Sequence, residues 1–273
     1  SEVLAETMPD LGPERLSFLS GPSFAKEVAR GLPTDVAVAS VEMTAANTVQ
    51  QMLHSPMFRV YTSPDPNGVQ VGGAIKNVIA ISAGMAEGMG FGDNTRATLI
   101  TRGLAEMTRL GVAMGGDPAT FAGLAGMGDL IATCSSSQSR NNTVGRRLGA
   151  GETIEQILDS MNMVAEGVKS SPSVLDLARR YGVEMPITEQ DVAVCHEGRS
   201  ARDALAAVMS RSNITEWRCK VAGRKKFEQI LSAFEDCRGP DVKKYVAAPC
   251  SNCKGQMRDL IDHYELRDKE GLT

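Results

Sequence analysis

The sequence predicts an α/β segment, then a larger all-helical domain, then a small C-terminal appendage. Three observations support this. Short strand-like and helix-like stretches alternate over residues 1–68, and from residue 69 to 211 apolar side chains recur at helical spacing. After Arg211 charges become denser, and residues 212–273 hold four of the six cysteines. Aromatic residues make up only 4% of the chain, which favours closely packed helices over a β-sandwich.

In the first part, we expect strands at residues 17–20, 35–40 and 58–62, with helices at 23–30 and 44–53. The turn at Gly21-Pro22 follows the first strand, and Gly31 is a plausible end for the first helix. A strand–helix–strand–helix–strand order is typical of an α/β fold. The turn into the first helix either presents free N–H groups to an anion or is an ordinary turn with a serine cap.

The cluster Ser63-Pro64-Asp65-Pro66-Asn67-Gly68 is rich in residues that break helices, so it marks the expected domain boundary. Beyond it, helices are expected at residues 75–85, 95–110, 118–125, 153–161, 173–181, 189–195 and 200–210. Residues 84–92 contain several glycines but lack the Gly-x-Gly-x-x-Gly spacing and follow a helix. They are therefore expected to connect two helices.

Charge and hydropathy exclude some classes of partner. A net charge of −4 without a sustained basic run argues against nucleic acid, and Arg224-Lys225-Lys226 is either a solvated helix face or a short anion patch. No stretch approaches the roughly 18 uninterrupted apolar residues that a membrane span needs. The opening Ser-Glu-Val-Leu-Ala-Glu lacks a basic region and a signal-peptide core, so we expect a cytoplasmic protein.

Two nearly charge-free stretches each contain one charged residue. Lys76 is the only charge between Val69 and Met85, and Asp129 is the only charge between Phe121 and Gln138. A charge in an apolar element must be paired, neutralised or directed into a cleft. Loss of water disfavours a lysine's charged form, so its neutral amine can accept a proton from an alcohol. Asp129, Arg140, Asn141 and Asn142 are expected on nearby loops, where they would suit a small polyol bearing an anionic group. A lysine that extends to water is the alternative.

Seven short motifs follow one another along residues 17–211. They are Ser20-Gly21-Pro22-Ser23-Phe24-Ala25, Gly72-Gly73-Ala74-Ile75-Lys76-Asn77-Val78-Ile79-Ala80, Ile100-Thr101-Arg102-Gly103-Leu104-Ala105-Glu106-Met107, Ala125-Gly126-Met127-Gly128-Asp129-Leu130, Ser139-Arg140-Asn141, Val164-Ala165-Glu166-Gly167 and Gly182-Val183-Glu184-Met185-Pro186-Ile187-Thr188. In this order and spacing they resemble the bacterial type of NAD(P)-dependent glycerol-3-phosphate dehydrogenase.

The resemblance implies NAD(P)H-dependent reduction of dihydroxyacetone phosphate to sn-glycerol 3-phosphate for phospholipid synthesis. It also implies roles for individual residues. Lys76 would be the general acid/base, with Asp129 as its catalytic partner. The substrate would contact Gly21, Ser23, Lys76, Asp129, Ser139, Arg140 and Asn141, and the cofactor would contact Ala25, Arg140, Val164 and Glu166. Asn77, Thr133 and Asn142 would support them. We expect a homodimer, from the apolar content of the helical domain.

Members of this family begin with a dinucleotide-binding half of the Rossmann type, built on a Gly-x-Gly-x-x-Gly turn. The sequence has no such turn, so residues 1–68 correspond to the C-terminal part of that domain. Residues 69–211 correspond to the helical substrate-binding and dimerisation domain. We expect this polypeptide alone to be inactive or nearly so. The choice between NAD and NADP depends on the residue that contacts the ribose. In this family that residue lies in the part of the dinucleotide-binding domain that has no counterpart in the sequence.

The tail, residues 212–273, does not resemble the dehydrogenase. Cys250 and Cys253 form a Cys-x-x-Cys pair, with Cys219 and Cys237 upstream, and four thiolates could hold zinc or an iron–sulfur cluster. The other interpretation is a small helical appendage with unligated thiols. The alternative function is therefore a non-catalytic scaffold with a metal-binding tail. Cys134 and Cys195 are expected in the core.

Overall fold

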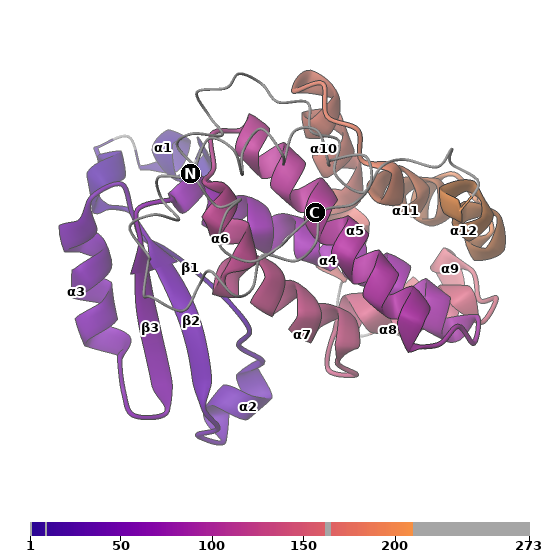
Figure 1. The fold of residues 1–273 in the computed structure, drawn as a ribbon, viewed down its shortest axis with the longest axis horizontal. Coiled ribbons are helices and arrows are strands. Elements are labelled where there is room, and N and C mark those ends of the chain that lie inside the picture. Colours follow the sequence, from indigo (N-terminus) through magenta and orange to yellow (C-terminus); the bar gives the residue numbers. More distant parts are fainter. Residues whose placement is uncertain (1, 9, 162–164, 210–273) are drawn as a thin grey trace, which may run out of the picture. The chain divides into compact units, whose positions relative to one another are not determined.

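The computed structural model describes residues 2–8, 10–161 and 165–209, and the predicted tail and its cysteines lie outside these ranges. Three strands and their helices come first, and helices make up the rest (Figure 1). The elements are α1 Glu2–Thr7, η1 Pro13–Arg15, β1 Phe18–Ser20, α2 Ala25–Ala29, β2 Thr34–Ala39, α3 Met43–Leu53, β3 Phe58–Ser63, α4 Pro66–Gly88, α5 Asp93–Ala113, α6 Pro118–Ala122, η2 Leu124–Gly128 (a π-helix), α7 Asp129–Ser135, α8 Arg140–Gly149, α9 Ile154–Ser160, α10 Glu166–Arg180, α11 Pro186–His196 and α12 Ala201–Met209. The predicted fold class is confirmed.

The sheet has the order β1-β2-β3, with β1 antiparallel and β3 parallel to β2. Apolar side chains cover both faces of β2, which explains its almost uninterrupted apolar sequence. Val36 and Val38 pack with Ala46 of α3, whereas Ala37 and Ala39 pack with residues of α4 and η2. The sheet therefore joins the helices through one face, and α3 covers the other (Figure 1).

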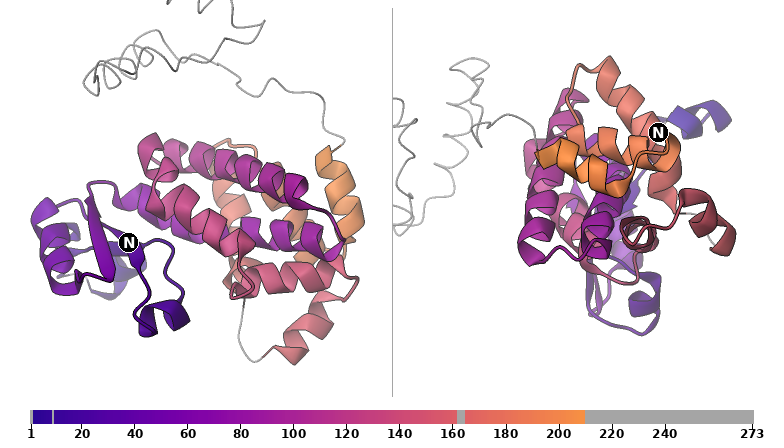
Figure 2. Two further views of the ribbon diagram at one scale, coloured as in Figure 1. Left: turned by 60° about the horizontal axis from the view of Figure 1, so that its bottom comes forward. Right: turned by 90° about the vertical axis from the view of Figure 1, so that its right-hand side faces the viewer.

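Helix α4 is the central element, with the sheet at its N-terminal end and other helices along the rest of it (Figure 2). Its start differs from the prediction, because Pro66–Gly68 already belong to the helix. Asp65 caps it by accepting a 2.8 Å hydrogen bond from the Gly68 amide, and proline suits the first helical position because its missing N–H is not needed there. The cluster that was interpreted as a breaker is thus a helix start. The proposed domain boundary at residue 68 stays a prediction.

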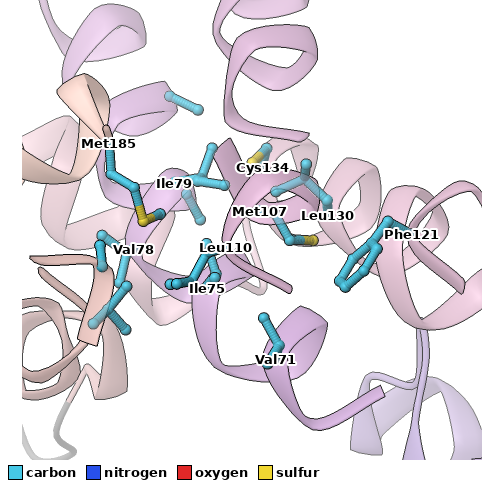
Figure 3. Close-up of a cluster of buried hydrophobic side chains, with 14 residues drawn as sticks. Val71, Ile75, Val78, Ile79, Met107, Leu110, Phe121, Leu130, Cys134 and Met185 are labelled. Carbon is cyan, nitrogen blue, oxygen red and sulfur yellow. The ribbon is translucent and has the colours of Figure 1, made fainter. Parts of the chain in front are cut away.

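By length and composition α4 could cross a membrane, but 72% of its most apolar window is buried among protein neighbours. The largest cluster around it includes Ile75 and Ile79 of α4 itself, with Met107 of α5, Phe121 of α6 and Leu130 of α7 (Figure 3). Packing in this core accounts for the apolar sequence of α4. Cys134 and Cys195 are buried as expected, and burial raises the pKa of the Cys134 thiol to about 12.

Helices α7 and α8 are not predicted by the sequence pattern, and they correct the expectation that Asp129, Arg140, Asn141 and Asn142 lie on loops. Asp129 is the first residue of α7, and the other three form the first turn of α8. Glycines allow α8 to touch α4 through its backbone. A Cβ at Gly84 would lie 2.9 Å from the Arg146 nitrogen, a spacing that real Cβ atoms do not adopt.

Two carboxylic acids are buried between α4, α5 and α11. Glu106 accepts hydrogen bonds from the Ile187 and Thr188 amides at 2.7 and 3.3 Å, so it caps the start of α11 from another helix. Burial nevertheless raises its pKa to about 7. Asp191 accepts a 2.6 Å bond from the Ser82 hydroxyl, and burial raises its pKa well above the ordinary value.

Candidate active site

The centre of the site is an ion pair between α4 and α7. Lys76 Nζ lies 2.5 Å from Asp129 Oδ2, and the two side chains are 21% and 4% exposed. The charge of Lys76 is therefore paired, as the sequence suggested, while part of its side chain reaches solvent. Such a lysine can hold a proton in a fixed position and deliver it to a molecule outside.

Close backbone contact brings the two charged groups together. Gly72 lies one turn before Lys76, and a Cβ there would overlap the carbonyl oxygen of Ala125. Ala125 belongs to the π-helix that leads directly into Asp129. Single turns of π-helix are often found at functional sites. The glycine therefore lets α4 and η2 approach closely enough for Lys76 to reach Asp129.

Two hydroxyl groups lie beside the Asp129 carboxylate. The Thr133 hydroxyl lies 3.3 Å from Oδ1, but its short bond, 2.6 Å, is to the Asp129 main-chain carbonyl. The Ser20 hydroxyl donates to Oδ2 across 3.4 Å. Ser20 stands at the end of β1, so this bond connects the sheet to the helical part. In the sequence Ser20 belongs to the first motif but has no role assigned to it. Its position beside Gly21 is the feature that could have marked it as a site residue.

A second set of polar contacts begins at Asn77, the residue after Lys76. Its Nδ2 donates to Glu166 Oε2 at 3.2 Å, and its Oδ1 accepts from Asn141 Nδ2 at 3.0 Å. The Asn141 Oδ1 accepts in turn from the Gly167 amide at 2.9 Å. Asn77 and Asn141 are buried, and they connect α4, α8 and the start of α10. The site residues of these three helices are thereby brought together.

The N-terminus of α8 presents a cation beside this network. Ser139 caps the helix by accepting a 3.2 Å bond from the Asn142 amide, and Asn142 Nδ2 donates to the Cys134 carbonyl at 3.0 Å. Arg140 is exposed, and among the residues the structure describes its guanidinium has no ion-pair partner. A free guanidinium at a helix N-terminus is suited to a phosphate group.

The turn after β1 flanks the pair. Gly21 has a φ of +141°, and a Cβ there would lie 3.0 Å from Cα of Val36, so glycine is required. The Ser23 hydroxyl donates to the Gly21 carbonyl at 3.0 Å. Ala25 is exposed at the start of α2. Val164 lies outside the described residues, and within them no group of three or more His, Cys, Asp or Glu could hold a metal.

Comparisons with known proteins show which family the chain is similar to. A model described as "NAD-dependent glycerol-3-phosphate dehydrogenase C-terminus" matches residues 65–206, and the corresponding N-terminus model matches residues 1–46. A relative from Trichlorobacter lovleyi, named glycerol-3-phosphate dehydrogenase [NAD(P)+], is 56% identical over 77% of this chain, and one of that name from Streptomyces coelicolor is 53% identical over 78%. The chain spans 63% of the length of each relative.

Solved structures show the same fold. The crystal structure of a glycerol-3-phosphate dehydrogenase from Coxiella burnetii matches with a TM-score of 0.70 and 40% identity, over 71% of this chain and 60% of that chain. A glycerol-3-phosphate dehydrogenase structure from Saccharomyces cerevisiae matches with a TM-score of 0.62 and 25% identity, over 70% and 58% of the two chains.

Proposed function

The chain belongs to the NAD(P)-dependent glycerol-3-phosphate dehydrogenase family, and we propose that its described residues form the substrate site of an enzyme that reduces dihydroxyacetone phosphate to sn-glycerol 3-phosphate. The observation that carries this proposal is the ion pair of Lys76 and Asp129, partly open to solvent on the lysine side. It supplies a proton donor, and the guanidinium of Arg140, which has no ion-pair partner among the described residues, supplies the phosphate ligand.

Reduction of the ketone adds a hydride to C2 and a proton to the C2 oxygen. Lys76 donates that proton from Nζ, and in the reverse direction its neutral amine accepts it. Asp129 holds the ammonium group in place, and the Ser20 hydroxyl donates to the carboxylate. The ammonium also stabilises negative charge that develops on the oxygen during the transfer.

The phosphate end of the substrate is assigned to the first turn of α8. The Arg140 fork can donate two parallel hydrogen bonds to phosphate oxygens, and the helix N-terminus favours the dianion. Ser139 and Asn141 adjoin Arg140 in the same turn, and Asn141 is fixed by Asn77 and Gly167. Gly21 and Ser23 are assigned to the glycerol part of the substrate.

The described residues also fit one end of a nicotinamide dinucleotide, NAD or NADP. The Glu166 carboxylate is exposed yet anchored by Asn77, so it can accept hydrogen bonds from an amide or a ribose hydroxyl. Arg140 can approach a cofactor phosphate, and Ala25 and Val164 are the other two residues that we assign to the cofactor. When bound, the nicotinamide supplies the hydride.

Binding of sn-glycerol 3-phosphate to the purified chain, measured by calorimetry, tests the proposal without requiring turnover. We expect saturable binding that is abolished in Arg140→Leu and unchanged in Arg179→Leu, whose guanidinium lies in an exposed pair with Asp176. Repeating the titration with NADH and NADPH tests the cofactor assignment, and oxidation of NADH on adding dihydroxyacetone phosphate tests catalysis. Equal binding by both arginine variants would contradict the proposed phosphate site.

The proposal includes a homodimer and a cytoplasmic location. Phe91 and Tyr181 are apolar side chains of the helical part that are 46% and 48% exposed, and we assign them to the contact between subunits. Light scattering coupled to size-exclusion chromatography should give twice the chain mass of 29.1 kDa. A monomer at all concentrations would contradict the dimer.

A further inference from the structure

A proline interrupts the hydrogen bonding of α10. Pro172 lies inside this helix, which runs from Glu166 to Arg180. In an uninterrupted α-helix the amide of residue 172 would donate to the carbonyl of Val168, four residues earlier. Proline has no N–H, so this carbonyl needs another donor. Val168 is 4% exposed, and an unsatisfied carbonyl at such a position would be costly.

His196, the last residue of α11, supplies the nearer of two donors. Its Nε2 lies 2.7 Å from the Val168 carbonyl oxygen and 3.4 Å from the Ser171 hydroxyl, and that hydroxyl donates a longer bond of 3.2 Å to the same carbonyl. A carbonyl oxygen only accepts, so Nε2 carries the hydrogen. Both the imidazolium and one neutral tautomer have this hydrogen, and the bond survives a change of charge on the ring.

The carbonyl held by His196 belongs to the turn of α10 that meets the candidate active site. Gly167, one residue earlier, donates its amide to Asn141, and Glu166 accepts from Asn77 beside Lys76. A Cβ at Gly167 would lie 2.5 Å from the Asn77 carbonyl oxygen, so this turn sits directly on α4. His196 and the two asparagines thus hold the turn at different points.

We propose that His196 is a positioning residue of the site. By replacing the hydrogen bond that Pro172 removes, it fixes the first turn of α10 and so places Glu166 and Gly167 against Asn77 and Asn141. The effect on ligands rests on the proposed function, because it requires Glu166 to contact the dinucleotide. The effect on the turn itself does not.

The proline provides a sharp test, because Pro172→Ala restores the missing amide. We would compare the full wild-type chain with His196→Ala, His196→Gln, Pro172→Ala and the double variant of His196→Ala with Pro172→Ala. Glutamine places an N–H close to the position of Nε2. Amide hydrogen exchange, read residue by residue by NMR, would report on Gly167, with Leu110 of the α5 core as the reference.

In His196→Ala we expect exchange at Gly167 to become about tenfold faster relative to Leu110, with the glutamine and double variants returning to about the wild-type rate. Unchanged exchange at Gly167, an equal increase at both amides, or no rescue by Pro172→Ala would overturn the proposal.

Binding measurements separate this inference from the proposed function. In His196→Ala the dissociation constant of the dinucleotide, measured by calorimetry, should rise about tenfold, since the lost contact orders a turn that binds it. A wild-type chain that binds no dinucleotide would contradict the cofactor assignment, whereas the exchange comparison would still decide whether His196 fixes the turn. An unchanged dissociation constant in a variant with faster exchange at Gly167 would overturn the assigned effect on the cofactor.

Discussion

Gly145 of α8 packs directly on Ile81 of α4, and a Cβ at position 145 would overlap the Ile81 carbonyl oxygen. The same relationship recurs one turn further along both helices. A Cβ at Gly149 would overlap the Met85 carbonyl, and one at Gly88 would overlap the Arg146 carbonyl. This backbone contact sets the distance between α4, which carries Lys76 and Asn77, and α8, which carries Arg140 and Asn141.

Gly145→Ala should therefore push α8 away from α4. We expect a loss of about 1–3 kcal/mol in the free energy of unfolding, because the methyl group meets backbone rather than a flexible side chain. Weaker binding of sn-glycerol 3-phosphate should accompany it. Urea unfolding and calorimetry measure the two effects. Gly92→Ala is the matched control, since a Cβ there meets nothing within 4 Å. Equal stability of the two variants would contradict the contact.

The sequence predicted most helices and strands because their apolar residues recur with the right period. The sequence pattern did not predict helix α8, because the first turn of this helix buries asparagines instead of apolar side chains. Asn141 and Asn142 are buried because Asn77, Gly167 and the Cys134 carbonyl satisfy them. Those partners come from other helices, and a pattern read along one segment contains no information about them.

The candidate site was predicted in part, for a related reason. Lys76 and Asp129 stood out as single charges in apolar stretches, which required that each have a partner. Ser20 carries no charge, so nothing in its neighbourhood demanded a partner, although it bonds to Asp129. The cluster around Asp65 was interpreted as a helix breaker, although a proline-rich cluster also fits a capped helix start. The hydrogen bond from the Gly68 amide to Asp65 decides between the two interpretations.

In a protein completed with a dinucleotide-binding half, for which turnover is expected, Asp129→Asn should lower kcat for the reduction of dihydroxyacetone phosphate by roughly two orders of magnitude, because Lys76 loses the charge that orients its ammonium. Stopped assays of NADH oxidation would measure this. Asp176→Asn is the control, because its ion pair with Arg179 is exposed on both sides and contributes little. A kcat equal to that of the control would show that the buried pair has no part in the reaction.

In the same completed protein, Arg140→Lys should raise the KM for dihydroxyacetone phosphate about tenfold or more while affecting kcat less, since lysine keeps the charge but loses the two-point geometry for phosphate. The comparison with Arg179→Lys controls for the same exchange at an exposed position. Inorganic phosphate as a competitive inhibitor gives a second measurement, and its inhibition constant should rise with the KM. An unchanged inhibition constant would place the phosphate elsewhere.

Glu106 should make the stability of the helical part depend on pH. Its pKa is raised to about 7 chiefly by burial, against the opposing effects of the Ile187 and Thr188 hydrogen bonds and the charge of Arg109. Between the ordinary value of 4.5 and about 7 the folded state binds more protons than the unfolded state. The contribution of Glu106 to the free energy of unfolding is therefore fully present below pH 4.5. It is lost as the pH rises through this window, which lowers the free energy of unfolding by about 3 kcal/mol.

Glu106→Gln removes this titration, so urea unfolding from pH 5 to 8 should show a shallower decline than in wild type. The amide loses one acceptor for the α11 amides, and the variant should therefore be less stable than wild type at pH 5, with the difference shrinking towards pH 8. Asp191 also has a raised pKa, partly through the charge of Glu106, and it contributes a residual decline of the same sign in the variant. Glu189→Gln, an exposed position on α11, controls for the loss of one negative charge. Parallel curves for wild type and Glu106→Gln would mean that the bonds from the two α11 amides and from the Thr188 hydroxyl outweigh the burial of this carboxylate and keep it ionised throughout.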